Sequence, residues 1–138
     1  MINSIYELNS LAGFDFSGPV AEAQIQEAQK ELETTFSDEF IEINRLYGAI
    51  SFYGHQLTGI SPYSGNNVVI VTIEERKNNP NLGNHYYVIE QAHIDGIVLW
   101  MKGDGAVYQT YPFSKPVKIS NSIIEYINYC TQLNDISR

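Results

Sequence analysis

The chain has 138 residues, and its 16 Asp and Glu against 8 Lys and Arg give a formal net charge of −8. This length fits one domain with one core, and the 43% hydrophobic content is too high for a disordered protein. The carboxylate excess disfavours direct nucleic-acid binding, and the single cysteine excludes an intramolecular disulfide.

No helix or strand is strongly predicted in the N-terminal segment. Ile2, Ile5 and Leu8 have helical spacing, but glycines and a proline interrupt the chain before residue 20. We expect a single domain over residues 1–138 in which residues 1–18 are weakly ordered. The start lacks a basic and apolar leader, and no apolar run is long enough to cross a membrane. We therefore expect a cytoplasmic protein without membrane contact.

Two amphipathic helices are predicted next, over residues 21–32 and 37–47. Apolar residues recur at steps of four, three and four, from Ala21 to Leu32 in the first helix and from Phe36, just before the cap, to Tyr47 in the second. The second helix has clear end signals, because Ser37 can cap its first amides and Gly48 can adopt the left-handed conformation that ends a helix. The two helices should form a pair.

Short strands are predicted to follow. Residues 49–53 and 55–58 are apolar runs joined near Gly54, and residues 59–67 are predicted to be a loop. The run from Val68 to Ile73 is β-branched and would form a strand by propensity, whereas its polar continuation to Asn78 favours a helix that Asn67 can cap. Periodicity alone leaves both alternatives open here.

The C-terminal half is predicted to be an antiparallel meander followed by a helix. Asp95-Gly96 is a strong hairpin signal between residues 86–90 and 97–101, and two further strands are expected at 106–111 and 117–119. Ser120 or Ser122 can cap a final helix whose apolar face consists of Ile123, Tyr126, Ile127, Cys130 and Leu133. The predicted fold class is α+β, with helices packed on a mainly antiparallel sheet.

No metal-binding motif stands out in the sequence. The three histidines, at positions 55, 85 and 93, lack the spacing of a helical metal pair, and a zinc site would need the fold to bring them together with a carboxylate such as Asp95. Cys130 lies on an apolar helix face, where a small buried thiol is the ordinary outcome. We expect no bound metal and no cofactor.

Catalytic signals are equally weak. Glu90, Asp95 and Asp104 lie on or beside the predicted hairpins, and a pair of them acting as general acid and base stays open as an alternative. However, Asp is common at hairpin ends for conformational reasons alone. We expect no catalytic residues.

Tyrosine is the conspicuous residue type. The chain has ten tyrosines, interleaved with acidic side chains, and a ring with a polar tip suits a protein-binding surface. In a meander about half of such rings must face the core. We therefore expect about half of the tyrosines to be structural, and the rest are available for a binding surface.

Several motifs resemble the SUKH superfamily. They are Ile25-x-x-Ala28-x-x-x-Leu32, Phe36-Ser37-x-x-Phe40, Leu46-Tyr47-Gly48, Phe52-x-Gly54, Gly59-Ile60 and Val68-Val69-x-x-Thr72-x-x-x-Arg76. The resemblance covers about residues 21–129, with Ser37 and Ala49 departing from the family's usual proline and glycine. It implies an α+β fold in which residues 68–76 are helical, and it supplies no catalytic motif.

The resemblance also implies a function. Bacterial members of the superfamily are typically immunity proteins that neutralise a polymorphic toxin, often a nuclease, and other members are signalling scaffolds. We therefore expect an immunity protein that occludes a basic cognate toxin, and a regulatory interaction domain is the alternative. The predicted partner-binding residues are Tyr53, Tyr63, Glu74, Glu75, Asp95, Trp100 and Asp104. An exposed strand near Val117 leaves the oligomeric state open.

Overall fold

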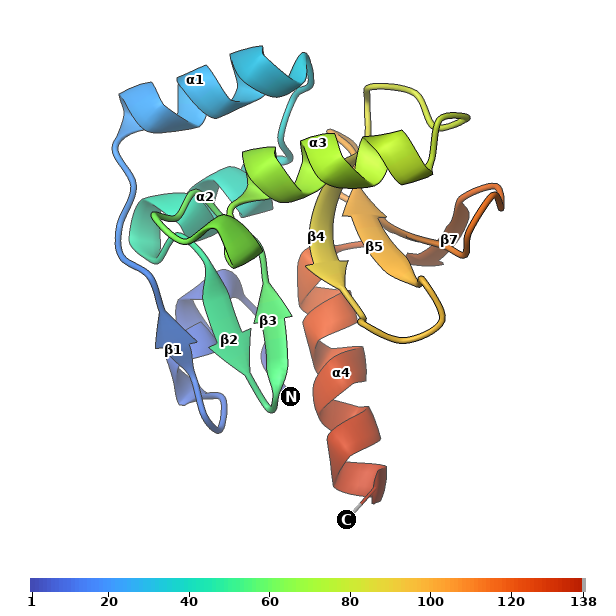
Figure 1. Ribbon diagram of the computed structural model, residues 1–138. Coiled ribbons are helices and arrows are strands. Elements are labelled where there is room, and N and C mark those ends of the chain that lie inside the picture. The colour runs from blue at the N-terminus through green and yellow to red at the C-terminus, as the bar shows by residue number, and fades with distance from the viewer. Residues whose placement is uncertain (138) are drawn as a thin grey trace.

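The computed structural model describes residues 1–137, with the side chains of residues 1–132 (Figure 1). The described chain contains two antiparallel sheets and helices, which confirms the α+β class. The elements in chain order are η1 (Ile5–Ser10), β1 (Asp15–Phe16), α1 (Glu22–Leu32), α2 (Asp38–Leu46), β2 (Ile50–Phe52), β3 (His55–Leu57), η2 (Ser64–Asn66), α3 (Val68–Asn78), β4 (Tyr87–Gln91), β5 (Val98–Met101), β6 (Val107–Thr110), β7 (Val117–Ser120) and α4 (Ile123–Ser137). None of the described helices is long and apolar enough to span a membrane.

The strands form two sheets where the sequence predicts one. The order β4-β5-β6-β7 is the predicted meander, and a smaller sheet has the order β1-β2-β3, in which β1 was not predicted. The two sheets meet where Thr58 follows β3, because its backbone N–H donates to Ile89 O at 2.8 Å and its hydroxyl donates to Val88 O at 2.7 Å. The strand β3 therefore lies beside β4.

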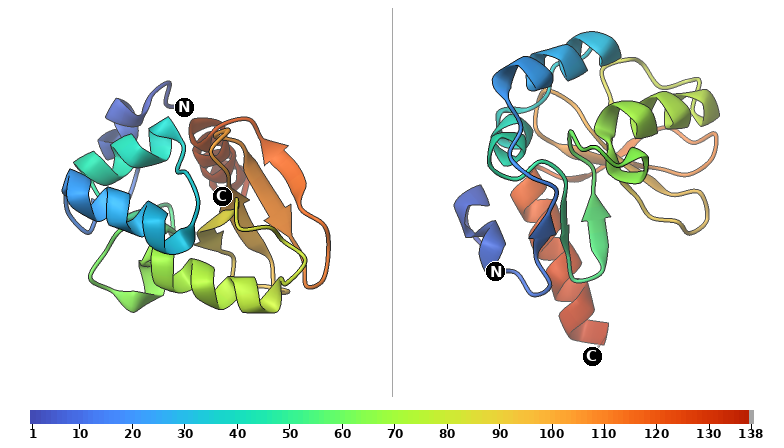
Figure 2. Two further views of the ribbon diagram at one scale, coloured as in Figure 1. Left: turned by 90° about the horizontal axis from the view of Figure 1, so that it is seen from above. Right: turned by 60° about the vertical axis from the view of Figure 1, so that its left-hand side comes forward.

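The helices pack against the two sheets in two groups. In Figure 1, α1, α2 and α3 lie at one end of the sheets, and α4 runs toward the opposite end; Figure 2 shows the same arrangement from two other sides. Helix α3 contacts β4 and α1, while α4 contacts β7. The strands β4 and β5 are consequently buried on both faces, as the burial of all four residues of β5 shows.

The helix ends agree with the sequence signals. Ser37 Oγ accepts from Phe40 N at 3.2 Å, Gly48 has a φ of 74°, and Ser122 Oγ accepts from Glu125 N at 3.1 Å. Asn67 Oδ1 accepts from Val69 N and from the next amide, so residues 68–78 begin as a capped helix. The helical alternative for this segment is confirmed.

The motif Val68-Val69-x-x-Thr72-x-x-x-Arg76, which lies in α3, has a structural role. The Thr72 hydroxyl accepts from Val88 N at 2.9 Å, and Arg76 donates to the carbonyls of Leu32 and Asn84, each at 2.9 Å. Burial lowers the pKa of Arg76 from its usual range. These hydrogen bonds connect α3 to β4 and to the end of α1. The motif therefore stabilises the fold and does not form a binding surface.

Residues 1–18, which the sequence predicts to be weakly ordered, form η1 and β1. Ile2, Ile5 and Leu8 are buried in the main core. The backbone of Ile2 also exchanges two hydrogen bonds with the Asn128 side chain of α4, at 3.0 and 2.8 Å. The segment thus packs against both the core and the last helix. Leu133, assigned to the apolar face of that helix, lies outside the described side chains.

Candidate functional site

A buried polar cluster lies between β3, β4 and α4, and His55 is its member from β3. The β2–β3 hairpin turns at Tyr53 and Gly54, whose φ values of 48° and 80° are those of a type I′ turn. This tight turn pairs Phe52 with His55 and fixes the register. His55 therefore shares the inward face of β3 with the buried Leu57, and its ring stacks on Phe52 at 5.8 Å between centroids.

A β-bulge in β4 directs Glu90 into the same cluster. Val88 pairs with Trp100 and Glu90 pairs with Leu99, so Ile89 is the extra residue. Regular alternation would place Glu90 on the face of Val88, toward α3. The bulge instead places the carboxylate on the α4 side, where it is 6% exposed and accepts a hydrogen bond from Tyr126 Oη.

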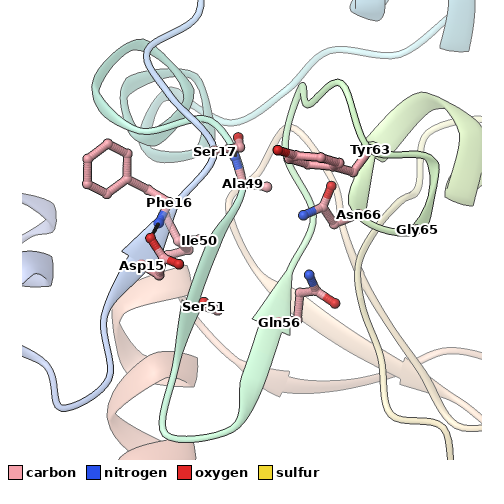
Figure 3. A pocket seen from close by; sticks show the side chains of 10 residues that line it. All are labelled: Asp15, Phe16, Ser17, Ala49, Ile50, Ser51, Gln56, Tyr63, Gly65 and Asn66. Carbon is pink, nitrogen blue, oxygen red and sulfur yellow. Dashed lines mark hydrogen bonds between the residues drawn. The ribbon is translucent and has the colours of Figure 1, made fainter.

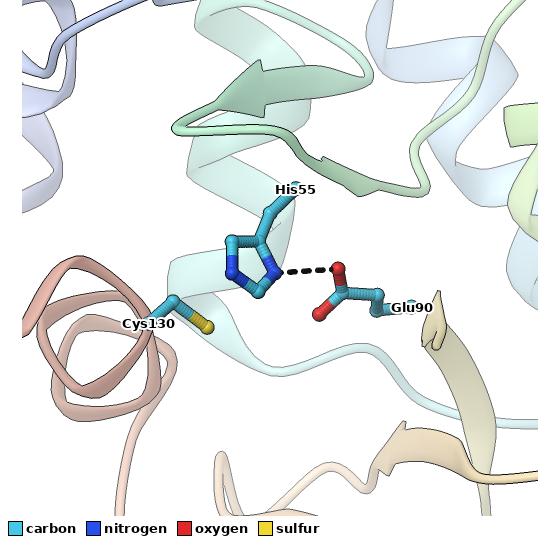
Figure 4. Close-up of side chains that lie close together, drawn as sticks. All are labelled: His55, Glu90 and Cys130. Carbon is cyan, nitrogen blue, oxygen red and sulfur yellow. Dashed lines mark hydrogen bonds and ion pairs between the residues drawn. The ribbon is translucent and has the colours of Figure 1, made fainter. Parts of the chain in front are cut away.

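Helix α4 supplies the remaining two side chains. Tyr126 and Cys130 are four residues apart, so they lie on one helix face, and both are buried. The Nδ1 atom of His55 lies 2.8 Å from Glu90 Oε2, and Figure 4 shows the Cys130 sulfur beside the same ring. One ligand atom from each of His55, Glu90 and Cys130 lies within 4.8 Å of the others.

The cluster is electrostatically coupled. The side chains of Cys130 and Glu90 favour the charged imidazolium and raise the pKa of His55 to about 10. Burial and the adjacent carboxylate raise the pKa of the Tyr126 phenol well above its usual range. The expected state is an imidazolium paired with a carboxylate and a neutral phenol that donates to it.

This cluster opens to solvent on one side. His55, Glu90 and Tyr126 line a cavity of about 510 Å³, and Cys130 is only 2% exposed. None of the seven predicted partner-binding residues lines this cavity. We considered His55, Glu90 and Cys130 separately in the sequence analysis. The signal for His55 was its position directly after the turn at Gly54 and two residues before the apolar Leu57, which places both side chains on the inward face of the strand.

One of the predicted partner-binding residues, Glu75, lines a second cavity of about 460 Å³, and two others adjoin its lining residues in the chain. Glu75, His93, Gly96, Ile97, Pro112 and Phe113 are among its lining residues, and we call it the hairpin groove. Glu74 and Asp95 are exposed neighbours of Glu75 and Gly96 in the chain. The β4–β5 connection separates this groove from the cavity over the cluster, because His93 and Ile97 line both.

The other predicted residues are dispersed. Tyr63 is 64% exposed and lines a smaller cavity of about 270 Å³ beside β1 and β2 (Figure 3). Tyr53 is half-buried at the β2–β3 turn. Asp104 lies in the β5–β6 turn, where it accepts from Tyr108 Oη at 2.8 Å and lies 3.9 Å from Lys102 Nζ. These positions do not form one surface with the hairpin groove.

Trp100 lies in the interior. It is fully buried against Val71, Val88 and Val98, and its indole N–H donates to Thr110 Oγ1 at 2.9 Å. Strand β5 is covered on both faces, so this ring offers no area to a partner. The three histidines lie in different environments. His85 and His93 are exposed, and only His55 enters the buried cluster.

Comparison with known families agrees with this architecture. The family SUKH_6, described as SMI1-KNR4 cell-wall, matches residues 22–127. The chain belongs to this SUKH family. The match extends from α1 into α4, so it includes the hairpin groove as well as His55, Glu90 and Tyr126. No curated protein matches the chain.

Proposed function

We propose that this chain is an immunity protein that binds a cognate toxin and neutralises it by occlusion, without chemistry of its own. Membership of the SUKH family is compatible with such a role. The observation that carries the proposal is the hairpin groove, where exposed apolar side chains lie next to carboxylates. This combination is typical of a protein-binding surface with an anchor and a charged rim.

The apolar part of this surface is conspicuous. Phe113 is 81% exposed and lines the groove, and Ile94 in the adjacent β4–β5 connection is 60% exposed. The left-handed conformation of Phe113, with a φ of 62°, is unfavourable for a bulky residue. An exposed aromatic ring on a constrained turn is a preformed anchor for a partner.

The charged part of the surface supports a basic partner. Glu75 lines the groove, and Glu74 and Asp95 are exposed neighbours in the chain of lining residues. The basic side chains in the lining are Lys77 and His93. A nuclease must present Lys, Arg or His to phosphate, so an acidic surface can occupy that site and accelerate encounter. The proposed partner is a basic nuclease toxin that contacts the hairpin groove, whereas Tyr53, Tyr63 and Asp104 lie away from this surface.

Co-expression tests the proposal. The product of the gene adjacent to this one is expressed alone, with the wild-type chain, and with the double variant Glu74→Lys/Asp95→Lys. The matched control is Glu27→Lys/Glu31→Lys, which changes the net charge equally on exposed positions of α1. We expect survival with the wild type and the α1 control, and loss of protection with the groove variant.

Two results would contradict the proposal. If the adjacent product is not toxic, or if the chain does not protect against it, the immunity role is wrong and a regulatory interaction domain becomes the better account. If both double variants protect equally well, the hairpin groove is not the contact surface.

A further inference from the structure

We propose that His55, Glu90 and Cys130 form a binding site for a zinc-type transition-metal ion, with Tyr126 orienting Glu90. The inference is independent of the immunity role and departs from the sequence-based expectation of no metal. It rests on three different ligand types that meet in a buried position from three separate elements (Figure 4).

The donor set suits zinc better than the hard cations. An imidazole nitrogen, a thiolate sulfur and a carboxylate oxygen are the three ligand types that Zn²⁺ binds in proteins. Mg²⁺ and Ca²⁺ prefer oxygen ligands alone. Zn²⁺ would displace one proton of the His55 imidazolium and the thiol proton of Cys130, and both would pass to solvent. The ion held by one thiolate, one carboxylate and a neutral imidazole is then charge-neutral, which matters because Glu90 and Cys130 are almost fully buried.

The geometry requires little rearrangement. Ligand atoms at about 2.0–2.3 Å from a tetrahedral zinc ion lie about 3.3–3.8 Å apart. The three atoms here lie within 4.8 Å of one another, so they would approach by at most about 1.5 Å. Each ligand is held by a fixed element: His55 by the β2–β3 turn, Glu90 by the bulge, and Cys130 by α4. Small side-chain movements would complete the coordination.

The surroundings contain the outer features of a metal site. The Tyr126 hydroxyl donates to Glu90, and such outer hydrogen bonds fix the orientation of a ligating carboxylate. The cavity of about 510 Å³ gives an entry path and leaves room for water at a fourth position. Three protein ligands and an open position would result.

The rival explanation is a structural ion pair. That account needs His55 and Glu90, which form the 2.8 Å contact, and it treats the Cys130 sulfur only as a further polar neighbour of the imidazolium. The two explanations differ in an observable way, because only a metal site forms a bond between the metal and the sulfur of Cys130.

Titration with Co²⁺ tests the proposal. The full chain is reduced, stripped of metal with a chelator, and titrated while its absorption spectrum is recorded, and Zn²⁺ then competes for the site. We expect saturation at one ion per chain with a sulfur-to-cobalt charge-transfer band that Zn²⁺ abolishes. Cys130→Ser should remove the band and weaken binding at least ~100-fold, more than the 10–100-fold typical of an outer-shell change.

Two further variants sharpen the test. Tyr126→Phe removes only the orienting hydroxyl and should weaken binding about 10-fold while the charge-transfer band remains. His93→Ala removes an exposed histidine that lines the same cavity and should leave affinity and spectrum unchanged. Absence of the charge-transfer band in the wild type would overturn the proposal, even if a variant fails to fold. So would a band that survives in Cys130→Ser or disappears in His93→Ala.

Discussion

The β2–β3 and β4–β5 hairpins of this protein have the same turn chemistry and opposite consequences. Both turn at a non-glycine residue followed by glycine with positive φ, with values of 48° and 80° at Tyr53-Gly54 and 55° and 69° at Asp95-Gly96. The first turn is tight and directs His55 into the buried cluster. The second lies in a longer connection that presents exposed residues beside the hairpin groove.

The difference between these regions is one of solvation. Inside, a carboxylate must be paired, because an unpaired buried charge is costly. Glu90 accordingly has His55 and Tyr126 as partners. Outside, Asp95 is solvated and can be used for binding a partner at little cost to folding. The buried region should respond to mutation in stability, and the exposed region should respond in binding.

The largest expected effect is the loss of Glu90. Glu90→Ala leaves the His55 charge without its partner, so we expect the free energy of unfolding to fall by about 3–5 kcal/mol. The matched control, Asp95→Ala, removes an exposed carboxylate and should change stability by about 0.5 kcal/mol or less. Urea denaturation with a chelator present measures both. A loss below about 1 kcal/mol for Glu90→Ala would show that the buried pair is dispensable.

The two turn glycines should differ by a smaller amount. Gly54→Ala places a side chain in a left-handed position with open space around it, which costs about 1 kcal/mol. At Gly96 the new Cβ would also lie 2.6 Å from Pro112 Cγ, so we expect about 2–3 kcal/mol. Thermal and urea denaturation check the difference. Equal costs would mean that Pro112 moves freely and that the groove wall is not rigid.

Phe113 should affect binding rather than folding. Phe113→Ala should weaken toxin binding about 10-fold, since an anchor contributes on the order of 1–2 kcal/mol or more. Its stability should change by about 0.5 kcal/mol or less because the ring is 81% exposed. Tyr6→Ala, a comparably exposed aromatic on η1, is the control for calorimetric titration. Equal affinities for the two variants would exclude Phe113 as an anchor.

The smallest expected effect concerns the association rate. Asp95→Asn should slow toxin association about 2–3-fold at low salt, because it removes one steering charge, and the difference should vanish at high salt. Glu27→Gln on α1 is the charge-matched control. Stopped-flow measurements across ionic strength distinguish the two, and identical salt dependence would argue against local steering at the groove.

Much of the fold was predictable from local signals. The caps at Ser37 and Asn67 and the turn at Asp95-Gly96 are formed by neighbouring residues, so the sequence indicates them directly. The helix at 68–78 needed the family resemblance, because its β-branched residues favour a strand when considered alone. The tertiary contacts with β4 and α1 outweigh that propensity.

The candidate sites were less predictable because they depend on distant contacts. His55 and Glu90 are 35 residues apart, and one extra residue at the bulge decides which face Glu90 occupies. No local pattern reveals that bulge. Trp100 illustrates the converse problem, since only the packing of α3 on the sheet shows that this aromatic residue is buried.

Hydrogen–deuterium exchange on the toxin complex tests the central claim most directly. The account predicts that toxin binding slows exchange in residues 92–97 and 111–116, which border the hairpin groove, and leaves residues 22–33 of the α1 region unchanged. Protection confined to the α1 region, with no change at the groove, would contradict the claim that this groove is the toxin-binding surface.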